Sequence, residues 1–193
     1  GVNVIPITSH IETGFALPPI DEFEKVITPK TKAIIICSPN NPTGYLYSKE
    51  EMYKLKDLCL KHDLYLFSDE AYREFCYDGD YVSALHIEGL EQHVVLMDTI
   101  SKRYSACGAR LGALVTKNKA VYDAAMKFAQ ARLSPPGLAQ IMGEAAIDLP
   151  ESYFEAPKAE YLSRRHLLVK RLNAMSGVVC PNPGGAFYAM AKL

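Results

Sequence analysis

The sequence predicts an α/β fold: a mostly parallel β-sheet with one antiparallel strand and flanking helices. Two observations predict it. Three short runs, apolar throughout and rich in β-branched residues, alternate with helical patterns, which is typical of a parallel sheet covered by helices. A fourth apolar run then begins only a handful of residues after Lys102, a connection too short for a parallel crossover.

The three parallel strands are expected at 33–37, 64–67 and 94–97. Each run stops at a polar cluster: the first at Ser-Pro-Asn-Asn-Pro-Thr-Gly, the second at Ser-Asp-Glu-Ala-Tyr, and the third at Asp-Thr. The carboxyl ends of parallel strands share one edge of the sheet. These polar clusters are therefore expected to lie near one another.

A helix is expected between the first two strands. Ser48 and Glu51 have the Ser-x-x-Glu spacing of a capping box, which marks a helix start. Apolar residues then recur at helical spacing and predict a buried stripe. These residues are Met52, Leu55, Leu58 and Cys59.

The fourth strand is expected at 110–115 and must run antiparallel to the third. Its first residue, Arg110, should therefore lie at the edge where the third strand ends. Helices are predicted at about 117–132 and 136–148, and a longer one through Tyr161 to Met175. This last helix is heavily charged, and we interpret it as a half-solvated connecting helix.

Both ends of the chain have strand-like sequence. Residues 1–7 are mostly apolar, and a further strand is expected to begin within 184–193. Because a domain seldom starts and finishes inside strands, we expect the chain to be a piece of a longer protein.

The composition excludes several classes of function. The chain has 193 residues, 49% of them hydrophobic, and a formal net charge of -1, so it has neither a basic surface for nucleic acid nor a polybasic membrane patch. No apolar run is long enough to cross a bilayer. Five widely spaced cysteines without a Cys-x-x-Cys pair indicate reduced thiols of a cytoplasmic protein. The histidines lack metal-ligand spacing, and no metal site is predicted.

Four polar residues from separate regions are expected at the same sheet edge: Asn41, Asp69, Lys102 and Arg110. Each alone has an ordinary structural explanation. Asn41 could be a turn residue, Asp69 a helix cap, and Arg110 a member of a surface ion pair. Their convergence makes these separate explanations improbable together.

Pyridoxal 5'-phosphate is the cofactor whose chemistry needs this set. A lysine amine, here Lys102, condenses with its aldehyde, and a carboxylate such as Asp69 keeps a proton on its pyridine nitrogen. An amide from Asn41 and a phenol from Tyr72 suit its phenolate oxygen. Arg110 and nearby hydroxyls suit its phosphate.

The motifs resemble those of the class I/II aminotransferases, the aspartate-aminotransferase-like family of fold-type-I pyridoxal-phosphate enzymes, over nearly the whole chain. The Asn-Pro-x-Gly and Asp-x-Ala-Tyr motifs and the Ser/Thr-x-Ser-Lys unit with its following arginine are all present. The resemblance implies a catalytic lysine at Lys102. It also implies cofactor contacts from Asn41, Asp69, Tyr72, Thr99, Ser101, Lys102 and Arg110.

The resemblance implies an enzyme of amino-acid metabolism that transfers an amino group between an L-amino acid and a 2-oxo acid, and that is a cytoplasmic homodimer. Residues 1–150 would be part of the large cofactor-binding domain, 151–176 the connecting helix, and 177–193 the start of a small C-terminal domain. It also favours a cis peptide bond between Asn41 and Pro42.

Three family features cannot be assigned in this sequence. They are the upstream glycine- or serine-rich phosphate turn, the aromatic ring that stacks on the cofactor, and the arginine that binds the substrate's α-carboxylate. We therefore expect this piece not to transaminate alone.

Two other functions remain open. One is a pyridoxal-phosphate-dependent carbon–sulfur β-lyase on the same scaffold, although residues 71–75 look more like a transaminase. The other is a ligand-sensing domain of a transcription regulator, which would need a DNA-binding helix-turn-helix upstream.

Overall fold

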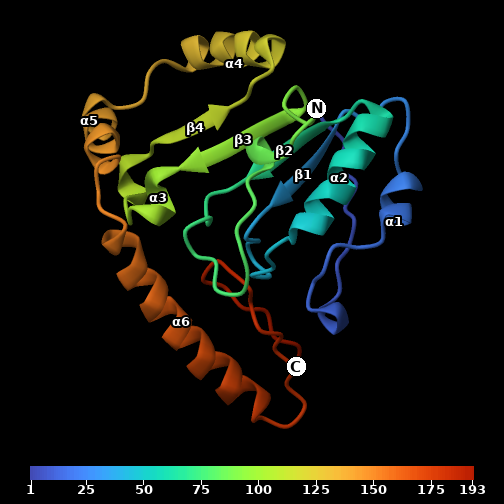
Figure 1. The fold of residues 1–193 in the computed structure, drawn as a ribbon, viewed down its shortest axis with the longest axis vertical. Coiled ribbons are helices and arrows are strands. Elements are labelled where there is room, and N and C mark those ends of the chain that lie inside the picture. The colour runs from blue at the N-terminus through green and yellow to red at the C-terminus, as the bar shows by residue number, and fades with distance from the viewer.

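The computed structural model describes residues 1–193 and contains one four-stranded mixed sheet (Figure 1). The strand order is β1-β2-β3-β4, with β1 parallel to β2, β2 parallel to β3, and β3 antiparallel to β4. The predicted fold class and the antiparallel direction of the fourth strand are therefore confirmed. The strands are β1 (Ala33–Cys37), β2 (Tyr65–Asp69), β3 (Val94–Thr99) and β4 (Gly112–Val115).

The predicted helices form in the predicted order, and two short α-helices, one before β1 and one directly after β3, add to them. The longest, α6, lies within the range expected for the connecting helix. None of the helices combines the length and apolar character that crossing a bilayer requires. The α-helices are α1 (Ile20–Glu24), α2 (Lys49–His62), α3 (Ile100–Arg103), α4 (Lys119–Arg132), α5 (Gly137–Ala146) and α6 (Ser152–Asn173), and the 3-10 helices are η1 (Ile11–Thr13), η2 (Ala84–His86) and η3 (Cys107–Ala109).

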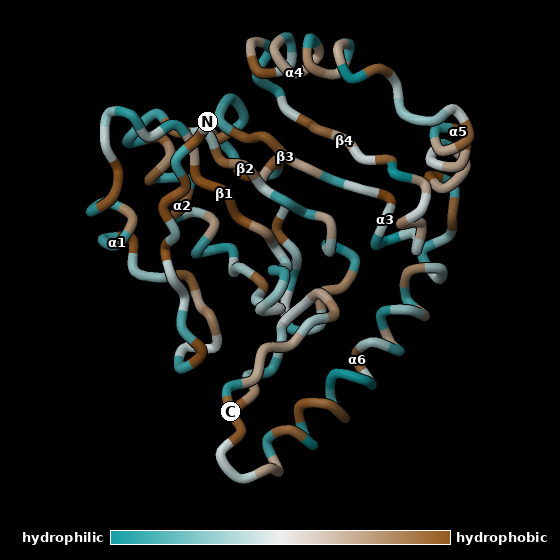
Figure 2. Tube along the Cα trace, turned by 180° about the vertical axis from the view of Figure 1, so that it is seen from behind, coloured by the Kyte–Doolittle hydropathy of each residue, from teal (hydrophilic) through white to brown (hydrophobic).

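The main core lies between α2 and one face of the sheet. The Ser48–Glu51 capping box forms as predicted. The predicted stripe of α2 is buried against alternate residues of the strands. The opposite face carries no helix in the view from behind (Figure 2). On that face, Ile35 of the edge strand β1 is 69% exposed, whereas Val95 of β3 is fully buried. The core includes Met52, Leu55, Leu58 and Cys59 from α2 and Ile36, Leu66, Val94 and Leu96 from the strands.

The strands expected at the two ends of the chain do not form. Residues 1–7 are irregular, and Val2 is 90% exposed. Residues 184–193 contribute only single bridges, from Gly185 to Cys76 and from Lys192 to Val179. A strand needs a continuous neighbour for its N–H and C=O groups, and neither segment runs alongside one.

The charged helix α6 is mostly solvated, as expected, but Arg165 is an exception. It is only 9% exposed. Its Nη1 donates to Asp78 over 2.5 Å and to the carbonyl of Pro183 over 2.8 Å. Arg165 thereby ties α6 to two loops, a role that the charge pattern of the helix did not indicate.

Glu70 is a buried carboxylate that fixes the end of β2. It is 1% exposed. Its Oε1 accepts from Ser68 and from the N–H of Ala84, and its Oε2 accepts from Ser83 and Tyr81. Burial raises the pKa of this carboxyl, and the hydrogen bonds from Ala84, Ser83 and Ser68 only partly oppose that rise.

We predict that Glu70→Ala destabilises the fold by about 2–4 kcal/mol, because it leaves several buried donors without an acceptor. Glu70→Gln should cost less, since the hydroxyls can rotate to accept from its amide. Denaturant unfolding measures both.

The contribution of Glu70 to the free energy of unfolding depends on pH. The raised pKa means that the folded state binds this proton more tightly than the unfolded chain. The stability it contributes is complete below the ordinary value of 4.5 and is lost as pH rises through the folded value. The unfolding free energy of wild type relative to Glu70→Gln should therefore fall as pH rises. A difference that rises with pH would contradict this assignment.

Candidate active site

Three polar turns meet at one edge of the sheet because β1, β2 and β3 end nearly level. In the parallel register, Cys37 pairs with Asp69 and Asp69 pairs with Met97. The turn after β1 contains Asn41, the turn after β2 contains Tyr72, and α3 follows β3 directly.

The turn after β1 is held by its own side chains. The Oδ1 of Asn40 accepts from the N–H and the hydroxyl of Thr43, over 3.2 and 2.9 Å. The peptide bonds Ser38–Pro39 and Asn41–Pro42 are both cis, so the cis bond predicted at Asn41–Pro42 is confirmed. Residue 44, with φ of 70°, is a glycine, as this left-handed conformation favours.

Asn41 and Tyr72 are in direct contact. The Nδ2 of Asn41 donates to the Tyr72 hydroxyl over 3.1 Å. Tyr72 is only 4% exposed. Burial raises the pKa of its phenol, and so does the neighbouring Tyr188 hydroxyl, while the Asn41 contact lowers it. The Tyr72 phenol is therefore protonated at neutral pH and able to donate.

Lys102 lies on α3, beside Tyr72. The Thr99 hydroxyl caps this helix by accepting from the N–H of Ser101 over 3.1 Å. The Nζ of Lys102 is 5.8 Å from the centre of the Tyr72 ring and 5.9 Å from that of Phe187. The ammonium group thus lies against two aromatic rings and has no carboxylate partner within ion-pair distance.

A cluster of charges joins α3 to the turn after β2. The guanidinium of Arg73 is 3.2 Å from the Asp98 carboxylate, and that of Arg103 is 3.1 Å from Glu74 and 3.6 Å from Asp98. The Arg103 side chain is 11% exposed, so solvent screens these pairs less than ordinary surface pairs. The cluster restrains the backbone on both sides of Lys102 and directly after Tyr72.

Thr99, Ser101 and Arg110 line one open pocket of about 370 Å³ with Asp98 and Arg132. The Thr99 hydroxyl is 2.8 Å from that of Ser101. Arg110 has φ of 56°, and its Nη1 donates to the carbonyl of Cys107 over 2.9 Å. Two hydroxyls and a guanidinium in one pocket form a site suited to an anion such as a phosphate.

Asp69 ends β2 at the same edge. Its Oδ1 accepts from the N–H of Ala71 over 3.1 Å, and its side chain makes no hydrogen bond to the other six predicted site residues. The structure therefore joins Asn41, Tyr72 and Lys102 in one cluster and Thr99, Ser101 and Arg110 in another. Asp69 lies three residues before Tyr72.

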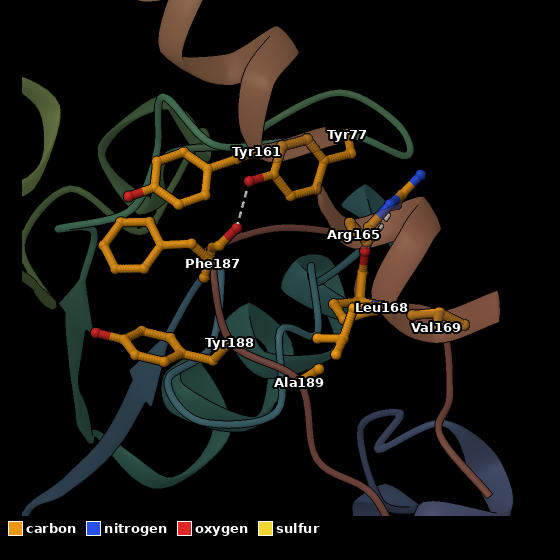
Figure 3. A pocket seen from close by; sticks show the side chains of 10 residues that line it. Tyr77, Tyr161, Arg165, Leu168, Val169, Phe187, Tyr188 and Ala189 are labelled. Carbon is orange, nitrogen blue, oxygen red and sulfur yellow. Dashed lines mark hydrogen bonds between the residues drawn. The ribbon is translucent and has the colours of Figure 1, made fainter. Parts of the chain in front are cut away.

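Sequence reasoning missed Phe187 and Tyr188, which reach the site from the C-terminal segment 184–188. The Tyr188 hydroxyl is 2.9 Å from that of Tyr72. The Phe187 ring stacks on Tyr161 at 5.0 Å (Figure 3). It also meets the Tyr72 ring edge-on at 5.3 Å. The Gly-Gly-Ala-Phe-Tyr sequence could have pointed to this segment, since paired glycines permit close backbone approach. It did not indicate which part of the fold the segment would approach.

Backbone hydrogen bonds hold the 184–188 segment against both turns. The N–H of Gly185 donates to the carbonyl of Gly44, and that of Ala186 to the carbonyl of Phe75, each over 2.8 Å. A Cβ on Gly185 would lie 2.6 Å from the Cβ of Pro39. Only glycine fits that approach.

The donors at this edge fit pyridoxal phosphate. A lysine amine, an amide and a phenol lie together, with a carboxylate on the neighbouring strand end and an anion pocket one helical turn away. These are the groups that its aldehyde, phenolate oxygen, pyridine nitrogen and phosphate require.

Comparison with known proteins supports this interpretation. The family model described as aminotransferase class I and II matches residues 10–193. The aromatic-amino-acid aminotransferase 2 of Thermococcus litoralis is 34% identical over the whole chain and 50% of the relative's length. The aspartate/prephenate aminotransferase of Cereibacter sphaeroides is 32% identical over 97% of this chain and 48% of its own length.

Solved structures show the same similarity. The aspartate aminotransferase of Thermus thermophilus with maleate has a TM-score of 0.87 at 32% identity and covers 95% of this chain and 48% of its own. The alanine aminotransferase of Pyrococcus furiosus has a TM-score of 0.87 at 33% identity over 95% of this chain and 48% of its own. The chain thus spans about half the length of the relatives that it matches.

We predict that Gly185→Ala displaces the 184–188 segment. The new methyl group would crowd Pro39 and the carbonyl of Phe75, and overpacking of this kind costs about 1–3 kcal/mol. Hydrogen exchange should show faster exchange of the amide of residue 185, which donates to Gly44, and of the Ala186 amide, which donates to Phe75. The control is Gly137→Ala, whose Cβ meets nothing within 4 Å. Equal protection in wild type and Gly185→Ala would contradict the prediction.

Proposed function

Because the chain belongs to the family of class I and II aminotransferases, we propose that it carries the cofactor-binding centre of a pyridoxal-phosphate-dependent aminotransferase. The reaction is transfer of an amino group between an L-amino acid and a 2-oxo acid. The observation that supports this most is the Lys102 amine beside a buried phenol, Tyr72, which Asn41 holds by a hydrogen bond.

The cofactor, when bound, supplies an aldehyde that condenses with an amine and a protonated pyridine ring that withdraws electrons from the substrate's α-carbon. Lys102 provides the amine. The Nζ of Lys102 would also serve as general base and acid, taking and returning the proton of the substrate's α-carbon. Its position among aromatic rings leaves it without a competing carboxylate.

Asp69 holds the proton on the pyridine nitrogen, since an ionised carboxylate favours the charged ring. Asn41 and Tyr72 donate toward the phenolate oxygen. Thr99, Ser101 and Arg110 bind the phosphate in the open pocket beside α3. Each role falls to a residue type whose chemistry fits it.

Further features of the whole protein belong to the same proposal. They are a homodimer, a cytoplasmic location, and division into a large domain within 1–150, a connecting helix at 151–176 and the start of a small domain at 177–193. The names of the relatives given above refer to aspartate, prephenate, aromatic amino acids and alanine. The proposal therefore names no single donor. The isolated chain should not transaminate, because it supplies neither a stacking ring nor a substrate-carboxylate arginine that we can assign.

The proposal predicts that Lys102 bonds covalently to the cofactor. Borohydride reduction of the intact protein with one equivalent of pyridoxal phosphate, followed by peptide mass mapping, should find the added mass on the peptide containing Lys102. Lys102→Ala should lose the label, whereas Lys117→Ala should keep it. A label on another lysine, or one that persists in Lys102→Ala, would refute the assignment.

In the full-length protein, Asp69→Asn should lower kcat by at least two orders of magnitude. The amide keeps the shape of the side chain but removes the charge that holds the ring proton, a loss of about 3 kcal/mol or more, the size found when a preorganised charge contact to a reacting group is removed. Steady-state kinetics with several amino donors measure it. Asp57→Asn, on the exposed side of α2, is the control. Activity within tenfold of wild type would mean that the ring nitrogen has another partner.

A further inference from the structure

We propose that Tyr188 is a positioning residue that commits the Tyr72 hydroxyl to donate its proton to the bound cofactor. The inference rests on the proposed function. It assigns a role to Tyr188, which lies in the 184–188 segment, 116 positions along the chain from Tyr72.

The proposal follows from counting protons and lone pairs around Tyr72. A phenol has one proton to donate and two lone pairs that accept. The Asn41 amide donates to Tyr72 and so occupies one lone pair. The Tyr188 hydroxyl, 2.9 Å away, can either accept the Tyr72 proton or fill the second lone pair. An anionic oxygen that accepts the Tyr72 proton would decide between these, because Tyr188 would then turn to donate to Tyr72.

With both lone pairs filled, the Tyr72 proton has only one destination. The hydrogen bonds also act in series. Each donor to the Tyr72 oxygen makes the Tyr72 proton more acidic, so the hydrogen bond that Tyr72 donates becomes stronger. Tyr188 therefore acts through Tyr72, without touching the cofactor itself.

The position of the Tyr188 hydroxyl is fixed by the segment that carries it. Ala186 is fully buried, and its carbonyl accepts from the Tyr77 hydroxyl over 2.6 Å (Figure 3). The Phe187 ring packs between Tyr161 and Tyr72. The rings of Tyr72 and Tyr188 meet edge-on at 5.4 Å. A rotamer change in Tyr188 would break this packing.

The sign of the effect can be derived. In the cofactor-loaded protein, the cofactor's phenolate oxygen would share a proton with the nitrogen of Lys102. A donor to that oxygen weakens its hold and lowers the pKa of the shared proton. Removing the Tyr188 hydroxyl weakens the Tyr72 donation, so this pKa should rise.

The test is a pH titration of the cofactor's absorption band in the intact, cofactor-loaded protein. Tyr188→Phe should raise the apparent pKa by about 0.5 unit or more, the size expected from weakening one hydrogen bond. The shift should vanish when Tyr188→Phe is made in a Tyr72→Phe background. Tyr161→Phe, which keeps the ring against Phe187 and removes a hydroxyl with no hydrogen-bond partner, should leave the pKa unchanged.

A second readout needs no cofactor. In cofactor-free protein labelled with fluorotyrosine, the ¹⁹F resonance missing from Tyr72→Phe identifies Tyr72, and Tyr188→Phe should shift it. An unmoved resonance overturns the proposal even if no cofactor binds, whereas failure of the wild type to bind cofactor counts against the proposed function alone. A pKa unchanged in Tyr188→Phe, or a shift that persists without Tyr72, also overturns it.

Discussion

The parallel pairing of β1, β2 and β3 is the constraint on which the rest of the site depends. Its register places Cys37, Asp69 and Met97 side by side, so the three strands end nearly level. The residues that follow each strand therefore lie at the same edge of the sheet. Asn41, Tyr72 and Lys102 come within reach of one another for that reason, although 61 positions separate the first from the last.

A second constraint comes from the far end of the chain. Segment 184–188 packs on the turns after β1 and β2 through backbone hydrogen bonds, among them those from Gly185 and Ala186, and through the close approach of Gly185 to Pro39. It brings Phe187 and Tyr188 against Tyr72 and closes the side of the Lys102 environment that the sheet leaves open. The sheet therefore brings the reactive residues together, and this segment determines what surrounds them.

Much of this could be predicted from sequence, because local patterns report local structure. The capping box of α2, the three apolar strands and the short connection that forces β4 antiparallel each depend on neighbouring residues. Tyr188 and the buried Glu70 could not be predicted, since their contacts join residues far apart or depend on burial that no periodicity reveals. The strands expected at residues 1–7 and 184–193 were wrong because apolar sequence alone supplies no pairing neighbour.

A crystal structure of the intact protein with pyridoxal phosphate tests the central claim most directly, that these separate turns form one cofactor site. Electron density should run continuously from the Nζ of Lys102 to the cofactor, with the phosphate bound by Thr99, Ser101 and Arg110 and the ring nitrogen facing Asp69. A cofactor joined to a different lysine, or a phosphate bound away from these hydroxyls and Arg110, would contradict it.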